Sequence, residues 1–151
     1  MILINIVPIS LKNANSFVTM YHRHNKRVTG HKFSLGLMHD DELIGVAIVG
    51  RPIARLLDTG DNLEILRVCI KPGAQKGANS KLYARCRRIG QLMGFKKIIT
   101  YTLETESQSS LKAVGARIDG KTKPQEWSRK SRKRESQSIY KQKKIRWELN
   151  C

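Results

Sequence analysis

The hydrophobic and polar positions of the chain follow two repeating patterns, one typical of strands and the other of helices. Apolar or alternating runs, each bounded by turn residues, predict strands. These runs cover residues 2–7, 33–38, 43–49, 63–70, 97–103, 116–119 and 144–149. The last run alternates Ile145, Trp147 and Leu149 with polar residues, which is the period of a half-buried strand.

Other segments have apolar residues three or four positions apart, which predicts helices. The first follows Ser10, a residue type that caps helices, and continues to Tyr21. The second places one apolar stripe against the core, made of Leu82, Cys86, Ile89 and Met93. A short third helix is expected over 106–114, ending at Gly115.

The order of these elements predicts an α/β chain with a mixed central sheet flanked by helices. The acidic tetrad His39-Asp40-Asp41-Glu42 separates two apolar runs, and its aspartates supply the turn chemistry of a hairpin. With 151 residues, the chain is expected to form one domain over 1–151. A basic arm at about 120–143 is expected to form an extended hairpin that leads into the last strand, and its part 128–138 is expected to order on its ligand; a disordered basic tail is the alternative.

Positive charge is the strongest signal in the composition. Lysine and arginine number 29 against 12 acidic residues, giving a formal net charge of +17. Such an excess concentrates polyanions near the protein and speeds encounter with them, so we expect a nucleic-acid partner. The residues expected to contact it are Arg23, Lys26, Arg27, Arg51, Trp127, Arg129, Lys130, Arg132, Lys133 and Arg134.

Other features bear on the compartment. No apolar run approaches the ~20 residues that cross a bilayer, and the first residues lack the basic region and cleavage site of a signal peptide. Cys69, Cys86 and Cys151 are too scattered for a disulfide framework or a zinc site. The cytoplasm of a bacterial host cell is the expected location.

The segment 64–93 has the pattern of a phosphate-binding unit: a strand, a loop with glycines and a helix. The first N–H groups of a helix lack partners within it, and its dipole favours negative charge there. Gly73 and Gly77 let the backbone approach a phosphate, Lys76 adds a cation, and Asn79 or Ser80 adds a polar side chain.

The order of elements over nearly the whole chain resembles the GNAT acyltransferase superfamily. The loop pattern of that family is Q/R-x-x-G-x-G/A, and the matching segment here keeps the glutamine but has Ala78 and Ser80 at the last two positions. The resemblance implies acetyl-CoA or another acyl-CoA as cofactor. It implies binding of its phosphates by Gln75, Lys76, Gly77, Ala78, Asn79 and Ser80, and of its pantetheine arm by the backbone of Val68, Cys69 and Ile70.

A closer resemblance is to phage Mom-type DNA-modification proteins and related phage proteins with a GNAT-like fold. The matching residues are Tyr21-His22, Leu43-Ile44-Gly45-Val46-Ala47, Gly50-Arg51-Pro52, Leu66-Arg67-Val68, Asn79-Ser80 and Thr100-Tyr101, within about Asn13 to Gly115. Mom proteins remodel the exocyclic amine of adenine in DNA, so this resemblance implies DNA rather than RNA as partner. In the family the tyrosine precedes Ala-Asp, whereas Tyr101 precedes Thr102-Leu103-Glu104.

Acyl transfer to an amine needs a polarised thioester carbonyl, a base for the amine and a proton for the leaving thiolate. Glu104, at the end of a strand, is the first candidate base, and Glu64 is the alternative. Tyr101 is a candidate acid or a ring that stacks on the substrate. Arg67, a cation within an apolar strand, must either pair with one of these glutamates or face a cleft where it meets a phosphate.

Two histidines follow the first helix, His22 and His24, with Arg23 between them. On a helix their side chains diverge by ~200°, so a shared metal ion is not expected. Alternating aromatic, imidazole and cationic groups can instead stack on a base and hold a phosphate, which makes both histidines candidates for the acceptor site. A plain basic helix end is the remaining interpretation.

Three functions follow from these features. The first is an acyl-CoA-dependent transferase that modifies a nucleobase amine in DNA, encoded by a phage or mobile element. The second is an aminoacyl-tRNA or protein N-acetyltransferase. The third is a nucleic-acid-binding phage protein without enzymatic activity, built on a degenerate GNAT fold.

Overall fold

A computed structural model describes residues 4–21, 26–74, 77–103, 108–122 and 144–151. In this part of the chain a seven-stranded sheet has the order β1-β2-β3-β4-β5-β7-β6. Its strands are β1 (Ile4–Pro8), β2 (Phe33–His39), β3 (Glu42–Gly50), β4 (Asn62–Ile70), β5 (Lys97–Leu103), β6 (Arg117–Thr122) and β7 (Lys144–Asn150). The helices are α1 (Leu11–Tyr21), α2 (Ala78–Leu92), α3 (Ser109–Ala113) and a single 3-10 turn, η1 (Arg55–Leu57).

The sheet consists of two antiparallel parts joined by one short parallel contact. Strands β1 to β4 pair antiparallel in chain order, and β7 pairs antiparallel with both β5 and β6. Between the two parts, β4 and β5 run parallel. The sheet is therefore mixed, as the order of apolar runs predicts.

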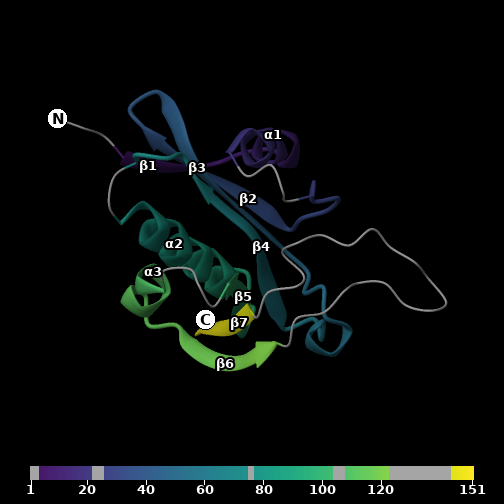
Figure 1. The fold of residues 1–151 in the computed structure, drawn as a ribbon. Coiled ribbons are helices and arrows are strands. Elements are labelled where there is room, and N and C mark those ends of the chain that lie inside the picture. Colours follow the sequence, from purple (N-terminus) through teal and green to yellow (C-terminus); the bar gives the residue numbers. More distant parts are fainter. Residues whose placement is uncertain (1–3, 22–25, 75–76, 104–107, 123–143) are drawn as a thin grey trace.

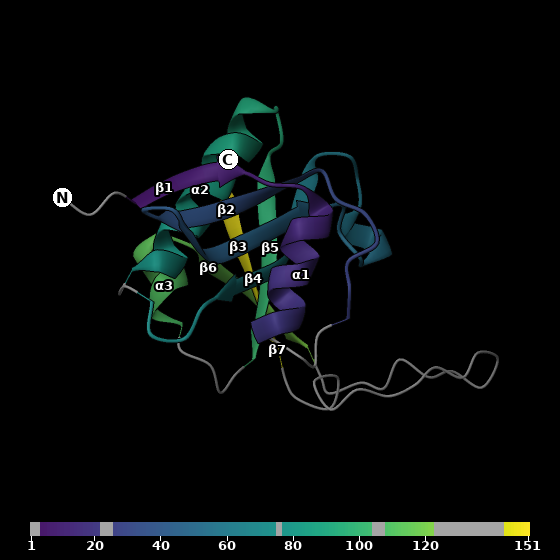
Figure 2. The same cartoon turned by 90° about the horizontal axis from the view of Figure 1, so that it is seen from above.

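Helices cover both faces of the sheet (Figures 1 and 2). Helix α1 packs Ala14, Phe17 and Val18 on one face, against β3 and β4. Helices α2 and α3 cover the other face, where Leu82 and Leu111 join the larger core cluster. We refer to these two sides as the α1 face and the α2 face. Each buries its own apolar layer, so the strands of the middle of the sheet are buried on both sides.

Most predicted elements are confirmed within the described residues. Ser10 caps α1, because the Asn13 N–H donates to the Ser10 Oγ over 3.1 Å. Leu82 and Cys86 are buried as expected, but Met93 is 49% exposed. The stripe stops short of Met93 because α2 ends at Leu92 and Gly94 turns the chain away with a φ of 90°.

The described part of the third predicted helix is α3, which begins at Ser109 and ends at Ala113, one residue before the predicted end; residues 106–107 lie outside the described residues. The basic arm over 123–143 also lies outside them. The last strand is confirmed as β7, and it inserts between β5 and β6. Among the described helices, none combines the length and the apolar character needed to cross a membrane.

Candidate active site at the divergence of β4 and β5

The parallel contact between β4 and β5 is limited to their first residues. Asn62, Leu63 and Glu64 pair with 97–99, and the paired register ends at Glu64 and Ile99. Beyond this point the described part of β4 pairs with β3 alone. The two neighbouring strands therefore diverge and leave one edge of each open from the middle of the sheet onward.

A β-bulge marks the point of divergence. Ile48 pairs with Arg67 while Val49 pairs with Ile65, so Leu66 is an extra residue on β4. An extra residue bends a strand and increases its local twist. The bulge follows Glu64 by two positions, which is where β4 leaves β5.

Backbone groups of β4 face the open edge beyond the bulge. The Lys71 N–H donates to the Ile44 carbonyl over 2.8 Å, and alternate residues of an antiparallel strand bond to the same neighbour. Cys69 therefore bonds toward β3, whereas the N–H and C=O groups of Val68 and Ile70 face the opening. The Cys69 side chain lies in the core on the α1 face, where burial raises the pKa of its thiol to about 11.

Helix α2 begins at the open end of β4. Gly77 is its N-cap with a left-handed φ of 89°, and no atom lies within 4 Å of the position a Cβ would occupy. The first helical bond runs from the Lys81 N–H to the Gly77 carbonyl. The N–H groups of Ala78, Asn79 and Ser80 precede it and have no partner within the helix, which favours an anion there.

The side chains of this first turn differ in their surroundings. Ala78 is buried at 6% exposure, so it offers its backbone alone. Asn79 is exposed, while the Ser80 hydroxyl donates to the Ser110 carbonyl of α3 over 3.5 Å. Gln75 and Lys76 lie outside the described residues.

Glu64 is a buried carboxyl group at the divergence. It is 5% exposed, and its Oε1 accepts a hydrogen bond from the Ile53 N–H over 3.2 Å. Burial raises the pKa of Glu64 to about 7, while the Ile53 N–H and the charges of Arg67 and Lys144 oppose this rise. The group therefore changes protonation near neutral pH, which suits a general base.

Polar side chains from three strands act on Glu64. Arg67 comes from β4, Tyr101 from β5 beyond its last pair with β4, and Lys144 from the start of β7. Burial, and then Arg67, lowers the pKa of Lys144. Burial, and then Glu64, raises the pKa of Tyr101, so this phenol keeps its proton at neutral pH.

Arg67 also connects β4 with the segment between α1 and β2. Its guanidinium donates to the Leu66 carbonyl over 2.6 Å and to the Lys26 carbonyl over 3.1 Å. Arg67 also lines a cavity of about 590 Å³, which is bordered by residues 27–32, by the loop between β3 and β4, and by β4 itself. Its charge also lowers the pKa of Glu64, so Arg67 acts on this glutamate electrostatically and borders a cavity at the same time.

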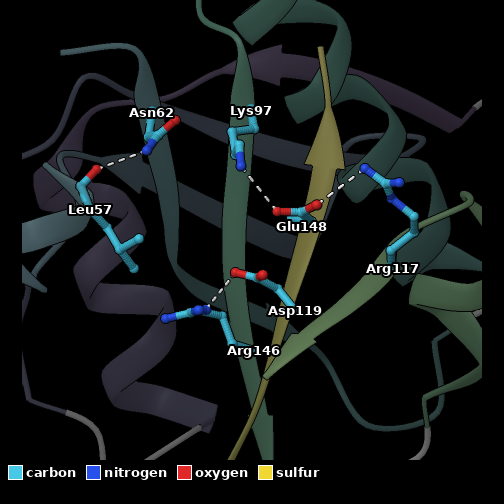
Figure 3. A network of polar contacts seen from close by, with 7 residues as sticks. All are labelled: Leu57, Asn62, Lys97, Arg117, Asp119, Arg146 and Glu148. Atoms are coloured by element: carbon cyan, nitrogen blue, oxygen red, sulfur yellow. Dashed lines mark hydrogen bonds and ion pairs between the residues drawn. The ribbon is translucent and has the colours of Figure 1, made fainter. Parts of the chain in front are cut away.

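The neighbouring part of the sheet carries two separate groups of ion pairs on the α1 face (Figure 3). Glu148 on β7 pairs with Lys97 at 3.2 Å and with Arg117 at 3.1 Å. Arg146 pairs with Asp119 at 2.8 Å. These residues alternate with the core residues of β7, so one face of β7 carries charged side chains while its opposite face is apolar.

The structure describes only part of the predicted site. Of the predicted catalytic residues, it brings Arg67 and Tyr101 together around Glu64, the alternative base. Lys26 and Arg27 are exposed after α1, and Arg51 pairs with Asp58 at 2.7 Å. The remaining predicted residues lie outside the described ranges: His22, Arg23, His24, Gln75, Lys76, Glu104, Trp127, Arg129, Lys130, Arg132, Lys133 and Arg134.

Some site residues carry no signal in the sequence. Ile53 contributes through its backbone N–H, which any residue but proline offers. Lys144 reaches Glu64 because β7 inserts beside β5, a long-range pairing that local patterns do not encode. For metals, no group of three or more potential ligands is present in the described ranges, and His22 and His24 fall outside them.

The mixed sheet and its flanking helices have the same fold as solved structures of GNAT acetyltransferases. Solved structures of these proteins superpose along almost the entire chain. An IAA acetyltransferase from Bacillus cereus matches with a TM-score of 0.75 at 14% identity, covering 99% of this chain and 100% of that one.

An acetyltransferase from Bacillus subtilis, solved with CoA, matches with a TM-score of 0.70 at 14% identity, covering 100% of this chain and 99% of the other. A GNAT-family acetyltransferase from Streptococcus pneumoniae matches at 0.67 and 9% identity, covering 98% and 99%. No protein-family model matches the sequence, and neither does any curated protein. The predicted GNAT-like fold is thus confirmed by structural similarity at very low sequence identity.

Proposed function

We propose that the protein is an acyl-CoA-dependent N-acyltransferase in which Glu64 is the general base. The observation that carries this proposal is the position of Glu64: buried, with a pKa raised to about 7, at the point where β4 and β5 diverge. A carboxylate with this pKa accepts a proton from an amine at neutral pH and is half ionised there. The GNAT fold supports the choice of acyl-CoA as donor.

The described residues fit such a donor at two places. The free N–H groups at the start of α2, after Gly77, suit its phosphates. The backbone groups of Val68 and Ile70 that face the open edge suit the amides of a pantetheine arm, because an unpaired strand edge offers donors and acceptors in extended geometry. When bound, the thioester supplies an acyl carbon activated for attack by nitrogen.

The protons of the transfer are assigned to residues of this chain. As the C–N bond forms and the C–S bond breaks, the amine loses one proton and the thiolate gains one. Glu64 takes the proton of the amine. Tyr101, which is protonated at neutral pH and whose pKa is raised by the charge of Glu64, donates the proton to the sulfur. Glu64 then releases its proton to solvent and Tyr101 takes one up from solvent, so that both residues return to their starting states.

The proposed acceptor is an amine of a nucleobase in DNA, as in the Mom-type proteins that the sequence resembles. The net charge of +17 supports a polyanionic acceptor. The location of Arg27, Arg51 and Arg67 around one cavity on the α1 face, next to Glu64, supports the same choice. A phage or mobile element acting in the cytoplasm of a bacterial host fits such a modification.

Calorimetry with acetyl-CoA tests the donor. Gly77→Asp places a Cβ and a negative charge at the start of α2, so it should weaken binding by about tenfold or more. Gly60→Asp is the matched control, because Gly60 has the same φ of 89° and equally open surroundings but lies in the loop before β4. Absence of heat with the wild-type protein, or equal loss in both variants, would contradict the proposal.

Mass spectrometry of nucleosides tests the acceptor. DNA from cells that express the protein should contain an acylated adenine or cytosine, and DNA from cells that express Glu64→Gln should not. If acyl-CoA binding is intact and DNA stays unmodified, the nucleobase is the wrong acceptor. Acylation of aminoacyl-tRNA or of protein amines in the same extracts would then identify the alternative.

A further inference from the structure

The cavity beside Glu64 is built from three separate segments of the chain. The segment between α1 and β2 contributes residues 27–32, the loop between β3 and β4 contributes residues from 51–58, and β4 contributes Leu66 and Arg67. Its volume is about 590 Å³, within the ~300–1,000 Å³ typical of small-molecule sites. It is therefore large enough for a nucleotide unit.

The charges of this cavity are strongly one-sided. Arg27, Lys32, Arg51 and Arg67 contribute cations, and the single carboxylate among its lining residues is Asp58. Asp58 is already engaged by Arg51, through both Nε and Nη2. Arg27 and Lys32 are exposed, and no carboxylate of the described residues pairs with either. Two cations on the wall thus stay available for an anion from solvent.

The remaining wall is apolar. Val28, Pro52, Ile53 and Leu66 line the cavity, and Ile53 is 60% exposed although it is a large hydrophobic residue. A bare phosphate needs no such surface. A nucleotide combines a phosphate with the flat apolar faces of a base, and proteins bind it with cations beside apolar or aromatic side chains. The two kinds of lining match the two ends of a nucleotide.

The cavity is directly linked to Glu64. The N–H of Ile53, a lining residue, donates to the Glu64 carboxyl group, and Leu66 and Arg67 follow Glu64 on β4 after a single intervening residue. A ligand in the cavity therefore lies beside the base, on the outside of the opening between β4 and β5. This is the position that an acceptor needs if the donor occupies the opening.

We propose that this cavity binds one nucleotide unit of a polynucleotide acceptor, with its phosphate held by Arg27 and Lys32 and its base against Ile53 and Leu66. The choice of an acceptor role rests on the proposed transferase function. The binding itself depends on the cavity alone. Lys32 and the apolar wall are thereby assigned a role in recognition.

Fluorescence anisotropy with a labelled single-stranded oligodeoxynucleotide tests this site, without any acyl-CoA present. The double variant Arg27→Glu/Lys32→Glu should raise Kd by about tenfold more than Arg85→Glu/Lys112→Glu does. The control pair is exposed on α2 and α3, across the sheet, and changes the net charge equally. Equal losses in the two double variants would mean general attraction only and would overturn the site.

Competition distinguishes a nucleotide site from a simple anion site. Deoxyadenosine monophosphate should displace the oligonucleotide at a concentration about tenfold or more below that of inorganic phosphate, and Ile53→Ser should reduce this difference. Equal competition by both compounds would overturn the nucleotide assignment. Arg27→Gln/Lys32→Gln, which removes charge without reversing it, should give an intermediate Kd and guards against misfolding of the double-glutamate variant.

The outcomes separate this site from the transferase proposal. If Arg27→Glu/Lys32→Glu weakens oligonucleotide binding more than the control pair does, but acetyl-CoA gives no heat, the nucleotide site stands and the transferase proposal fails. If acetyl-CoA gives heat but oligonucleotide affinity falls equally in both double variants, the donor site stands and the nucleotide site is excluded.

Discussion

Glu64 shows how the placement of one residue produces its chemistry. A glutamate on a solvated strand is a weak base with an ordinary pKa, but the middle of this sheet removes water from it. Arg67 and Lys144 provide positive charge without returning the pKa to its usual range. In the proposed reaction, this balance keeps the group ionisable near neutral pH.

The raised pKa predicts a pH dependence of stability. Below its ordinary pKa of 4.5, Glu64 is protonated in both states, and its contribution to stability is complete. As pH rises toward about 7, the unfolded chain has released this proton while the folded chain still holds it, so stability falls. The loss is on the order of 3 kcal/mol.

Urea unfolding between pH 5 and pH 8 measures this effect. Glu64→Gln should lack most of the fall in unfolding free energy, because the amide oxygen still accepts from Ile53 and carries no charge. Asp41→Asn, in the exposed hairpin turn, is the control and should behave as wild type. A wild-type decline that persists in Glu64→Gln would contradict the assignment.

The same residue predicts a pH dependence of activity. The transfer rate of the wild-type protein should rise as pH passes through about 7, where Glu64 becomes ionised. Glu64→Gln should lower kcat by about 10² to 10⁴, the usual contribution of a general base. An unchanged kcat would point to another base, with Glu104 the next to test.

At the scale of elements, the position of β7 decides the site. Local patterns predict a strand at 144–149, and the structure has β7 at Lys144–Asn150. Its insertion between β5 and β6 brings Lys144 beside Leu103 and thus toward Glu64. Strand order depends on contacts far apart in the sequence, and the alternation of apolar residues only says which face of a strand is buried.

A buried hydrogen bond joins β7 to β5 on the α2 face. The Trp147 indole N–H donates to the Thr102 hydroxyl over 3.0 Å, and Trp147 is 1% exposed. Thr102→Val keeps the shape of the side chain but leaves the indole N–H without an acceptor. It should lower the unfolding free energy by about 1–3 kcal/mol, measured by urea denaturation.

Thr102→Ser is the matched variant for this bond. It keeps the hydroxyl and removes one methyl group, so its cost should be about 1 kcal/mol. A valine variant more stable than the serine variant would show that the bond adds little and that packing alone holds β7.

At the scale of the whole molecule, the sheet separates two surroundings. Its middle strands are buried between α1 and α2, while the α1 face of β7 carries charged side chains that pair with residues of β5 and β6. The open edge of β4 lies between them, with the basic cavity beside it. In the proposed reaction, the donor in the opening and the anionic acceptor in the cavity approach Glu64 from different directions.

The excess positive charge predicts that the proposed nucleic-acid binding is sensitive to salt. The logarithm of oligonucleotide affinity should fall linearly with the logarithm of salt concentration, by roughly 0.7 for each phosphate neutralised on a single strand. Anisotropy titrations at several salt concentrations measure this slope. Arg27→Glu/Lys32→Glu should reduce its magnitude by about one or two, and salt-independent binding would contradict an electrostatic interface.

The sequence by itself determined most of the elements and the class of fold. The spacing of apolar residues located the strands and two of the helices closely, because an element that buries one face has apolar residues at the period of that element. The sequence also indicated Gly77 and the start of α2, because the residue types that begin a helix, and the glycines that allow a positive φ, act locally. The charge of +17 required no structure.

Tertiary structure alone decided which candidates meet. The candidates Glu64, Arg67 and Tyr101 come from β4 and β5, and the bulge at Leu66 and the order of the strands bring them together with Lys144 of β7, which was not a candidate. The pKa of Glu64 depends on the water that these neighbours exclude, and the cavity depends on segments from three parts of the chain. Burial and distance are properties of the folded molecule, so no local pattern in the sequence could have revealed them.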